Sequence, residues 1–514
     1  MPEPWRRTRI VRPIAALIAA LAAGGCGRPP DPATTLTLAI DGGPASLDPR
    51  LGSDEASKRV NDLLFNGLFR LDDEARPVPD LAAAHDRPDP LTLVVRLQDG
   101  VRFHDGSPLT ADDVVATYRS ILADEVPSFR KADLAAIAGL EARDARTIVF
   151  TLRETFAPIL TNLNIPILKA GAGPDAGRNP IGTGPFRLVR YRKDEDLLLE
   201  RFPDHFRGSA GVAHLRLRIV PSETGRLLEI LKGSTDLIVN DLAPDHLARL
   251  RRTPGFRVLA RPGRNYVYMA FNCRDPIVSD PRIRRAVALA LDRRAIVDHL
   301  LHGAATLATG MLPPHHWAYA ADVPRHDYDA AAARRLLDQA GRPDPDGDGP
   351  RVRFRLAYKT STSELAQQQA AVIQEHLARV GIGVDIRALE WPTFYEDLKA
   401  GRFQVVVSMW TEITDPDVLR LRFHSGFVPP AGFNRGGYAD PEVDGWIDRG
   451  ARSLEDAVRA SLYGRVQRRL AEDLPYVPLW HRDVVAVARD RVEGFRLTPG
   501  ADFHVLREVR LAPR

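Results

Sequence analysis

Residues 102–114 of the chain, RFHDGSPLTADDV, bring together side chains that could do chemistry. His104, Asp105, Asp112 and Asp113 fall within ten positions of one another. A histidine with carboxylates is a donor set that binds divalent metals, and a histidine beside an aspartate can serve in acid–base catalysis. A secreted metal-dependent hydrolase that uses His104, Asp105 and Asp112 is therefore one hypothesis for this protein.

The same stretch also fits a purely structural interpretation. Asp105-Gly106-Ser107-Pro108 is a strong turn sequence, because Asp and Gly tolerate turn dihedrals and Pro fixes its own φ. Thr110, followed three residues later by Asp113, resembles a capping box with Asp in place of the usual Glu. Apolar residues then recur at helical spacing. These preferences favour a strand, a turn and a capped helix over a chemical role.

The N-terminus has the layout of a secretory signal. Four arginines before residue 13 precede the apolar run PIAALIAALAAGG, which is too short to span a membrane, and Cys26 follows. Ala23-Gly24-Gly25-Cys26 resembles the lipobox of bacterial lipoproteins, with Ala23 where Leu is usual. We expect residues 1–25 to be a signal peptide, Cys26 to carry lipid, and the Pro-rich residues 26–33 to form a tether.

The remaining charges nearly balance. The chain has 71 basic and 67 acidic residues, a formal charge of +4, and the first 25 residues carry +3 of it. A body with a charge near +1 gives no support to nucleic-acid binding. With 514 residues, the chain is long enough for at least two lobes.

No cofactor or metal site is expected elsewhere in the chain. With Cys26 acylated, Cys273 is the one remaining cysteine, so no disulfide can form. The stretch 344–349, DPDGDG, imitates the start of a calcium loop, but Arg355 stands at the twelfth position, where a bidentate acid is needed. No nucleophile elbow, phosphate-binding Gly-Lys loop or paired-Cys zinc spacing occurs.

The region from residue 351 has the clearest pattern of secondary structure. RVRFRLAYK alternates as a strand, ELAQQQAAVIQEHLARV is an amphipathic helix, and GVDIRALE alternates again. The helix PTFYEDLKAG and the apolar strand FQVVVSMW follow, so the order is β-α-β-α-β, which indicates an α/β lobe. Upstream, Asp280-Pro281 starts an amphipathic pattern that predicts one helix over 281–301.

A series of motifs, in order along the mature chain, resembles one family: the bacterial extracellular solute-binding proteins of family 5, the peptide and nickel receptors of ABC importers. The block LTLVVRLQDGVRFHDGSPLTADDVVATY looks like the signature of that family. The other motifs are SLDP at 46–49, LFNGLF at 64–69, NPIGTGPFRL, FNCRDPIVSDPRIRRAVALALDRRAIV, YDAAAARRLLDQAG, the Trp and Asp-Pro near 410–416, and LYGRVQRRLAEDLPYVPLW.

The resemblance implies a two-lobed α/β periplasmic-binding-protein fold with an inserted third subdomain, joined by a hinge. Lobe I would comprise 34–55, 181–267 and 485–514, with 56–180 as its inserted subdomain, and lobe II would comprise 268–484. The chain would be a monomeric receptor without cofactor or catalysis. It would capture an oligopeptide or related small solute in the periplasm or cell envelope, where a lipid anchor holds it to a membrane, and deliver the solute to a membrane permease with its cytoplasmic ATPase.

Ligands of this family lie extended between the lobes and pair with main-chain groups. On this chain the matching positions are Ser53, Asp54 and Glu55 in one lobe and Trp410, Thr411 and Glu412 in the other. Backbone pairing suits a receptor that accepts many side chains, because it supplies affinity without reading them. Trp410 also ends an apolar strand, and ligands of α/β sheets dock at that edge. The alternative is that Trp410 is a core aromatic at a strand end.

One departure from the family bears on the ligand. Peptide-binding members place an Asp a few residues after the Trp to pair with the peptide's α-amino group, but the run here is one residue shorter and has Ile413 at that position. Glu412 or Asp415 could replace it, although Asp415 also suits a cap on a helix that begins at Pro416. A receptor for a metal chelate or another non-peptide solute therefore stays open beside the peptide receptor.

Overall fold

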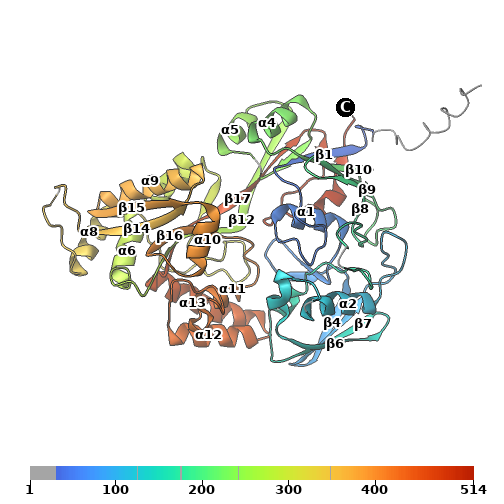
Figure 1. Ribbon diagram of the computed structural model, residues 1–514, viewed down its shortest axis with the longest axis horizontal. Helices are drawn as coiled ribbons and strands as arrows, with labels where there is room; N and C mark the ends of the chain where they lie inside the picture. Colours follow the sequence, from blue (N-terminus) through green and yellow to red (C-terminus); the bar gives the residue numbers. More distant parts are fainter. Residues whose placement is uncertain (1–30, 124, 174–175, 241, 348, 514) are drawn as a thin grey trace, which may run out of the picture.

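Two long strands connect the two bodies of the molecule. The computed structural model describes residues 31–513 apart from positions 124, 174–175, 241 and 348. Figure 1 shows the bodies side by side, with β12 (Phe256–Phe271) and β17 (Tyr476–Arg489) running from one to the other. Among the helices in these described residues, none is both long enough and apolar enough to cross a membrane. The expected two-lobed α/β architecture is confirmed.

One sheet runs through both bodies. Its order is β15-β14-β16-β12-β17-β11-β1-β10-β9-β8, and β13 pairs with β17. β12 and β17 are antiparallel along their whole length, and their register shifts between Pro262 and Asn265 and again between Val267 and Tyr268. The other strands of this sheet are β1 (Thr35–Ile40), β8 (Phe186–Arg192), β9 (Asp196–Arg201), β10 (His214–Ile219), β11 (Leu237–Val239), β13 (Ala305–Leu307), β14 (Phe354–Ser361), β15 (Ile382–Leu389) and β16 (Val405–Trp410).

Lobe II is the body built on β14, β15 and β16. The predicted β-α-β-α-β order is present as β14, α9 (Glu364–Ala378), β15, α10 (Trp391–Lys399) and β16, with β14 parallel to both other strands. The carboxyl ends of the three strands therefore share one edge. The remaining helices of this lobe are α6 (Pro281–Ala290), α7 (Arg293–Ala295), η3 (Ile296–Leu300), α8 (Ala330–Gln339), α11 (Val418–Phe423), η4 (Ser425–Phe427), α12 (Pro441–Arg452) and α13 (Asp456–Asp473).

Lobe I is the body built on β1 and β8 to β11, and a small subdomain lies beside it. The subdomain has its own sheet, in the order β4-β5-β7-β6, with α2 packed against β6 and β7. The elements of these parts are α1 (Glu55–Leu64), β2 (Phe69–Leu71), β3 (Pro77–Pro79), β4 (Ala82–Asp89), β5 (Thr92–Leu97), α2 (Ala111–Leu122), η2 (Phe129–Leu134), β6 (Ile137–Asp144), β7 (Thr147–Leu152), α3 (Ile159–Asn162), α4 (Glu223–Lys232), α5 (Pro244–Leu250), β18 (Val492–Glu493), η5 (Phe503–Glu508) and β19 (Arg510–Leu511).

The single helix expected over 281–301 is wrong. Helix α6 ends at Ala290, and a second helical segment starts after Asp292. The Asp292 carboxylate accepts a hydrogen bond from the Ala295 N–H at 2.9 Å, as an N-cap does. Because the apolar spacing continues through the break, hydrophobic periodicity alone predicts an uninterrupted helix.

The stretch 102–114 forms a bridged turn and a helix cap. Arg102 pairs with Pro108 across the turn, and Gly106 has a φ of +85°, a conformation that suits glycine. Thr110 precedes α2. Its backbone N–H and its hydroxyl donate hydrogen bonds to the Asp113 carboxylate, at 2.8 Å and 2.9 Å. The structural interpretation of this stretch is confirmed.

The glycines of the motif IGTGPF let the chain pass close to α1. The Gly184 N–H donates to the Leu64 carbonyl at 3.0 Å, at the end of α1. A Cβ atom at Gly182 or Gly184 would collide with the carbonyl oxygens of Leu64 and Leu63, which are backbone atoms that cannot turn away. This part of lobe I therefore requires glycine for close packing.

We expect Gly182→Ala to destabilise the protein by about 3 kcal/mol, because the added methyl group overpacks a backbone contact. The matched control is Gly139→Ala in β6, where a Cβ would meet no atom within 4 Å, and it should change stability by less than about 0.5 kcal/mol. Urea unfolding followed by circular dichroism measures both. Equal stability of the two variants would contradict the packing account.

Candidate functional site

The His104 imidazole has both ring nitrogens engaged inside the protein. Nδ1 accepts the Gly182 N–H at 3.2 Å, which leaves Nε2 to carry the proton and donate to the Gly184 carbonyl at 3.1 Å. Burial lowers the pKa of His104 to about 4, so the ring is neutral at physiological pH. No lone pair of the ring remains for a metal. The two hydrogen bonds of the ring connect the turn to the glycine motif.

The acids of the same stretch do not converge on His104. Asp105 binds the Lys169 ammonium at 2.6 Å, and this hydrogen bond lowers the pKa of Asp105 to about 2. Asp113 is the helix cap and also accepts the Ala170 N–H at 2.7 Å, while Asp112 is exposed. Across the residues that the structure describes, no group of three His, Cys, Asp or Glu side chains could hold a metal ion.

The two segments expected to bind ligand meet through a residue that the sequence did not indicate. Lys58, on the first turns of α1, places its Nζ 2.5 Å from Oε1 of Glu412, just beyond the end of β16. The Glu412 side chain is 51% exposed and the Lys58 side chain 34%, so the ion pair lies at the surface where the lobes meet. Nothing local marks Lys58, because its partner lies some 350 residues further along the chain.

A second carboxylate holds Lys58 from its own lobe. Asp502 Oδ1 lies 3.1 Å from the Lys58 Nζ, and its other oxygen accepts the Thr498 hydroxyl at 2.8 Å. Burial opposes the charged form of Lys58, but Glu412 and Asp502 outweigh it and raise the Lys58 pKa above its ordinary value. The Lys58 charge in turn lowers the pKa of Glu412. Nearby, burial raises the pKa of Asp62 to about 7.

Glu412 occupies a backbone conformation that costs energy. Its φ is +52°, in the left-handed region, where a residue with a side chain is uncommon. The Glu412 N–H donates to the Asn265 Oδ1 at 3.2 Å, and the next N–H, of Ile413, donates to the Arg264 carbonyl at 3.1 Å. Ile413 is fully buried. Anchors on both sides thus fix the turn that presents the Glu412 carboxylate.

The three expected positions of lobe I differ in their roles. Ser53 is exposed. Asp54 is the N-cap of α1, and its carboxylate accepts the Ser57 N–H at 2.8 Å. Glu55 is exposed and forms an ion pair with Arg59 one turn along the helix. Asp54 therefore has a structural task that explains its presence without a ligand.

Asp415 is committed to the interior of lobe II, and Thr411 is exposed. The Asp415 carboxylate is buried, lies 2.6 Å from the Arg459 guanidinium and accepts the Asp417 N–H at 2.8 Å. The helix expected to begin at Pro416 begins at Val418, with Asp417 at the cap position, so that prediction is wrong by two residues. Of the two acids that could receive an amine, only Glu412 faces the surface between the lobes.

Trp410 is half-buried and contacts one aromatic ring and two arginines. Its indole is stacked on Tyr268, with ring centroids 5.9 Å apart and planes at 10°. Arg422 lies on it with its Cζ 4.2 Å from the indole centroid, and Arg435 lies at 4.8 Å. The core contact expected as an alternative is therefore present, together with a charged neighbourhood.

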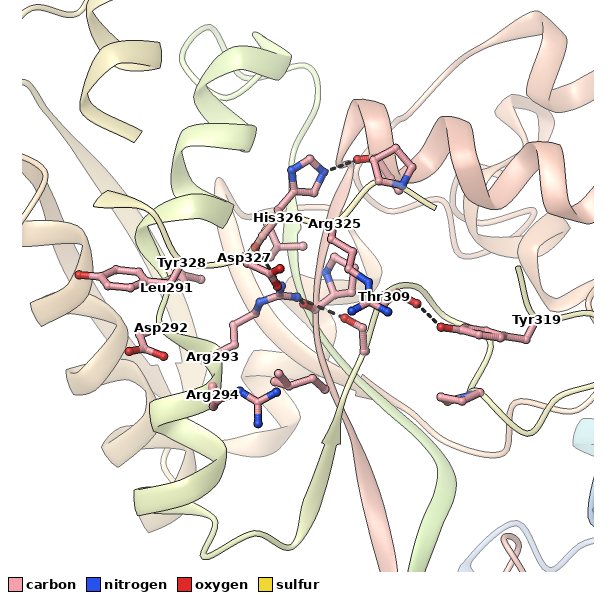
Figure 2. A pocket seen from close by; sticks show the side chains of 17 residues that line it. Leu291, Asp292, Arg293, Arg294, Thr309, Tyr319, Arg325, His326, Asp327 and Tyr328 are labelled. Carbon is pink, nitrogen blue, oxygen red and sulfur yellow. Dashed lines mark hydrogen bonds between the residues drawn. The ribbon is translucent and has the colours of Figure 1, made fainter. Parts of the chain in front are cut away.

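A separate pocket of about 620 Å³ lies within lobe II (Figure 2). Arg293 reaches across it, and its guanidinium donates to the carbonyls of Ala308 at 3.2 Å, Pro478 at 2.5 Å and His326 at 2.9 Å. These bonds tie the loop after β13 to β17. None of the expected ligand residues lines this pocket.

A family comparison identifies the class of protein. The model for the middle part of the bacterial extracellular solute-binding proteins, family 5, matches residues 76–426. The chain belongs to this family. Its members bind solutes and do not convert them, so this family member is the substrate-binding component of an ABC transporter and not an enzyme. The hydrolase hypothesis is thereby wrong.

Individual relatives match along nearly the whole chain. Protein XP55 of Streptomyces lividans is 31% identical over 95% of this chain and 93% of its own. The oligopeptide-binding protein AppA of Bacillus subtilis is 26% identical over 93% and 91%. The structure of AppA with a nonapeptide, at 25% identity, gives a TM-score of 0.75 over 93% of this chain and 99% of that one. NikZ of Campylobacter jejuni with Ni(L-His), at 24% identity, shares the fold, with a TM-score of 0.76 over 93% and 100%.

The neutral His104 ring predicts a pH dependence of stability. The pKa of His104 in the folded protein, about 4, lies below its ordinary value of 6.5. Between these two pH values the unfolded chain binds more protons than the folded protein does. Stability is therefore lost as the pH falls from 6.5 towards 4. At pH 5 this single histidine accounts for about 2 kcal/mol of that loss. We therefore expect His104→Gln to lose less stability between pH 7 and pH 5 than the wild type.

Urea unfolding at the two pH values measures this difference, and His299→Gln, at an exposed position, is the matched control for removing an imidazole. If the His104→Gln variant lost as much stability as the wild type, His104 would not be held neutral in the folded protein.

Proposed function

We propose that this solute-binding protein captures short peptides between its lobes and delivers them to an ABC permease. The ion pair between Glu412 and Lys58 carries the proposal. At the surface where the lobes meet, Glu412 accepts an ammonium group at 2.5 Å, and the α-amino group of a peptide is the same kind of donor. Lys58 thus stands where a ligand's ammonium would bind.

The charge pattern supports an incoming cation. Among the described residues, Lys58 is the one cation within ion-pair distance of Glu412, and its ammonium group also pairs with Asp502. Because the Glu412 side chain is half exposed, a ligand can reach it without unfolding its surroundings. The left-handed turn at Glu412 holds the carboxylate in place before ligand arrives, which reduces the ordering cost of binding.

Main-chain recognition would supply the rest of the affinity. In this proposal the segments Ser53–Glu55 and Trp410–Glu412 pair with the peptide backbone from opposite lobes, as a strand pairs with a sheet edge. Exposed Ser53 and Thr411 leave room for such pairing. Asp54 and Asp415 would support these segments through their internal hydrogen bonds.

Closure would pivot where β12 and β17 pass from one lobe to the other. The proposed lobes are those of the expected division, 34–55 with 181–267 and 485–514, and 268–484, with 56–180 as the inserted subdomain. The register shift between Pro262 and Asn265 lies close to the sequence break between 267 and 268. Other contacts join the parts across this line, such as the Ala157 N–H to the Ala451 carbonyl at 2.8 Å.

The receptor would work from a lipid anchor. Cys26, which lies outside the described residues, follows an apolar leader and precedes a Pro-rich tether, and this order supports lipidation after removal of residues 1–25. Periplasmic delivery to the permease would then take place beside the membrane.

The second candidate ligand is a metal chelate. Ile413 stands where peptide receptors place an amine-binding Asp, and NikZ, which shares the fold, is known with Ni(L-His). A chelated metal brings its own donors, so this candidate needs no metal-binding cluster in the protein.

We expect Glu412→Gln to weaken binding of a free-amine tripeptide by about 10- to 100-fold, because a charge-assisted hydrogen bond becomes a neutral one. An N-acetylated tripeptide should bind the wild type and the variant equally. Calorimetric titration measures both, and Glu375→Gln, an exposed acid on α9, is the matched control.

Mass spectrometry of solute released from gently purified protein decides between the candidates. Released peptides would support the proposal. A released metal chelate, together with no thermal shift from a peptide library, would contradict it and favour the second candidate.

A further inference from the structure

We propose that Arg422 and Arg435, whose guanidinium groups both lie over the Trp410 ring, form a subsite for a carboxylate of the ligand. This inference rests on the proposed function, since it places the subsite on the ligand-binding surface of lobe II. In this subsite, Arg422 and Arg435 would select ligands that carry a negative charge.

The two guanidinium groups share one aromatic platform. Their Cζ atoms lie 4.2 Å and 4.8 Å from the Trp410 centroid, and 5.9 Å and 5.5 Å from the Phe433 centroid. Cation–π contacts hold the guanidinium groups, but they leave the in-plane N–H donors available for a planar acceptor. A carboxylate is such an acceptor.

Neither arginine has an anionic partner in the part of the chain that the structure describes. Their Nε atoms are buried and meet no acceptor. Arg422 donates once, to the Val418 carbonyl at 2.8 Å, and no side-chain hydrogen bond joins Arg435, which is only 4% exposed. The neighbouring Asp417 is already paired with Arg420 at 2.6 Å.

Other buried arginines in the described residues have hydrogen-bonded partners. Arg459, 5% exposed, is paired with Asp415, and Arg284, also 5% exposed, donates to four backbone carbonyls between 2.5 and 3.1 Å. Arg59 and Arg264 also have an Nε without an acceptor, but Arg59 pairs with Glu55 and Arg264 donates to the Asp72 carbonyl. Among the buried arginines of the described residues, Arg435 is the one without a side-chain hydrogen bond. An unpaired buried charge is costly, and an anion that enters removes the cost.

The electrostatic surroundings of the two arginines favour an anionic ligand. Burial lowers the pKa of Arg422 to about 10, and the charge of Arg435 adds to this effect. Two like charges in a desolvated place destabilise the empty protein and raise its affinity for an anion.

Exposed aromatic side chains lie beside the two arginines. Phe433 and Tyr395 are each 38% exposed, and Trp391, 58% exposed, is stacked on Tyr395 at 5.8 Å. Large exposed aromatic side chains that border charged groups are typical of binding surfaces. The ligand class that fits is a carboxylate beside an apolar or aromatic group.

The carboxylate could be a peptide C-terminus or an acidic side chain. Glu412 lies two residues beyond Trp410, at most about 7 Å along the chain, so an ammonium on Glu412 and a carboxylate on the arginines belong to a compact ligand. Short zwitterionic peptides meet this requirement.

Arg435→Met gives a test that needs no ligand. If Arg435 is an unpaired buried charge, the variant should have a higher melting temperature than the wild type, whereas Arg284→Met, which removes bonded donors, should melt lower. A lower melting temperature for Arg435→Met would assign Arg435 a structural role and overturn the inference. Arg422→Met repeats the test at the less buried position.

Calorimetric titration of the intact protein then tests the anion site. The wild type should bind phenylacetate but not phenylacetamide, and Arg435→Met should weaken phenylacetate binding at least 10-fold. For peptides, loss of affinity on C-terminal amidation of Ala-Phe-Ala would identify the C-terminus as the source, and loss only on Glu→Gln exchange within Ala-Glu-Ala amide would identify a side chain.

The two proposals fail separately. Binding of phenylacetate without any peptide binding would leave the subsite standing and remove the peptide function. Equal affinity for acids and amides, with no phenylacetate binding, would remove the subsite and leave the peptide function.

Discussion

The antiparallel pairing of β12 with β17 is the constraint on which the rest of the structure depends. These strands are hydrogen-bonded to each other in both lobes, so they fix which edge of one lobe faces the other. Tyr266 on β12 pairs with Trp410 at the end of β16, which puts the residues after Trp410 at the junction. The Asn265 side chain, at the register shift itself, accepts the Glu412 N–H. The strand that joins the lobes therefore also shapes the turn that presents Glu412.

The polar groups of the protein divide by how completely they are satisfied. His104, Asp113 and Asp415 have partners for all or most of their hydrogen-bonding capacity, and those partners belong to the same fold. Groups saturated in this way stabilise a single conformation. By contrast, the Glu412 carboxylate is half exposed, and the Nε atoms of Arg422 and Arg435 have no acceptor. In the proposed function these two features lie on the ligand-binding surface.

Local signals in the sequence predicted local structure well. The turn and cap after Arg102 depend on residues within ten positions, and the β-α-β-α-β order of lobe II follows from periodicity within each segment. The interruption of the helix at Leu291 is not visible in that periodicity, because a cap at Asp292 competes with an apolar pattern that continues unchanged. Lys58 and Arg435 could not be found at all. Their roles depend on distant partners, or on the lack of them, and a basic residue in an ordinary amphipathic segment gives no sign of either.

The run after Trp410 presents Glu412, which we propose as the amine-binding acid in place of the expected Asp. Ile413, at the position where the resemblance places that Asp, is fully buried and points its apolar side chain into lobe II. The chain turns just before this residue, at Glu412, which has a left-handed conformation. Glycine would adopt this conformation at lower cost, but it would remove the carboxylate. The strained backbone of Glu412, its exposed carboxylate and its contact with the Lys58 ammonium from the other lobe support the proposed amine-binding role.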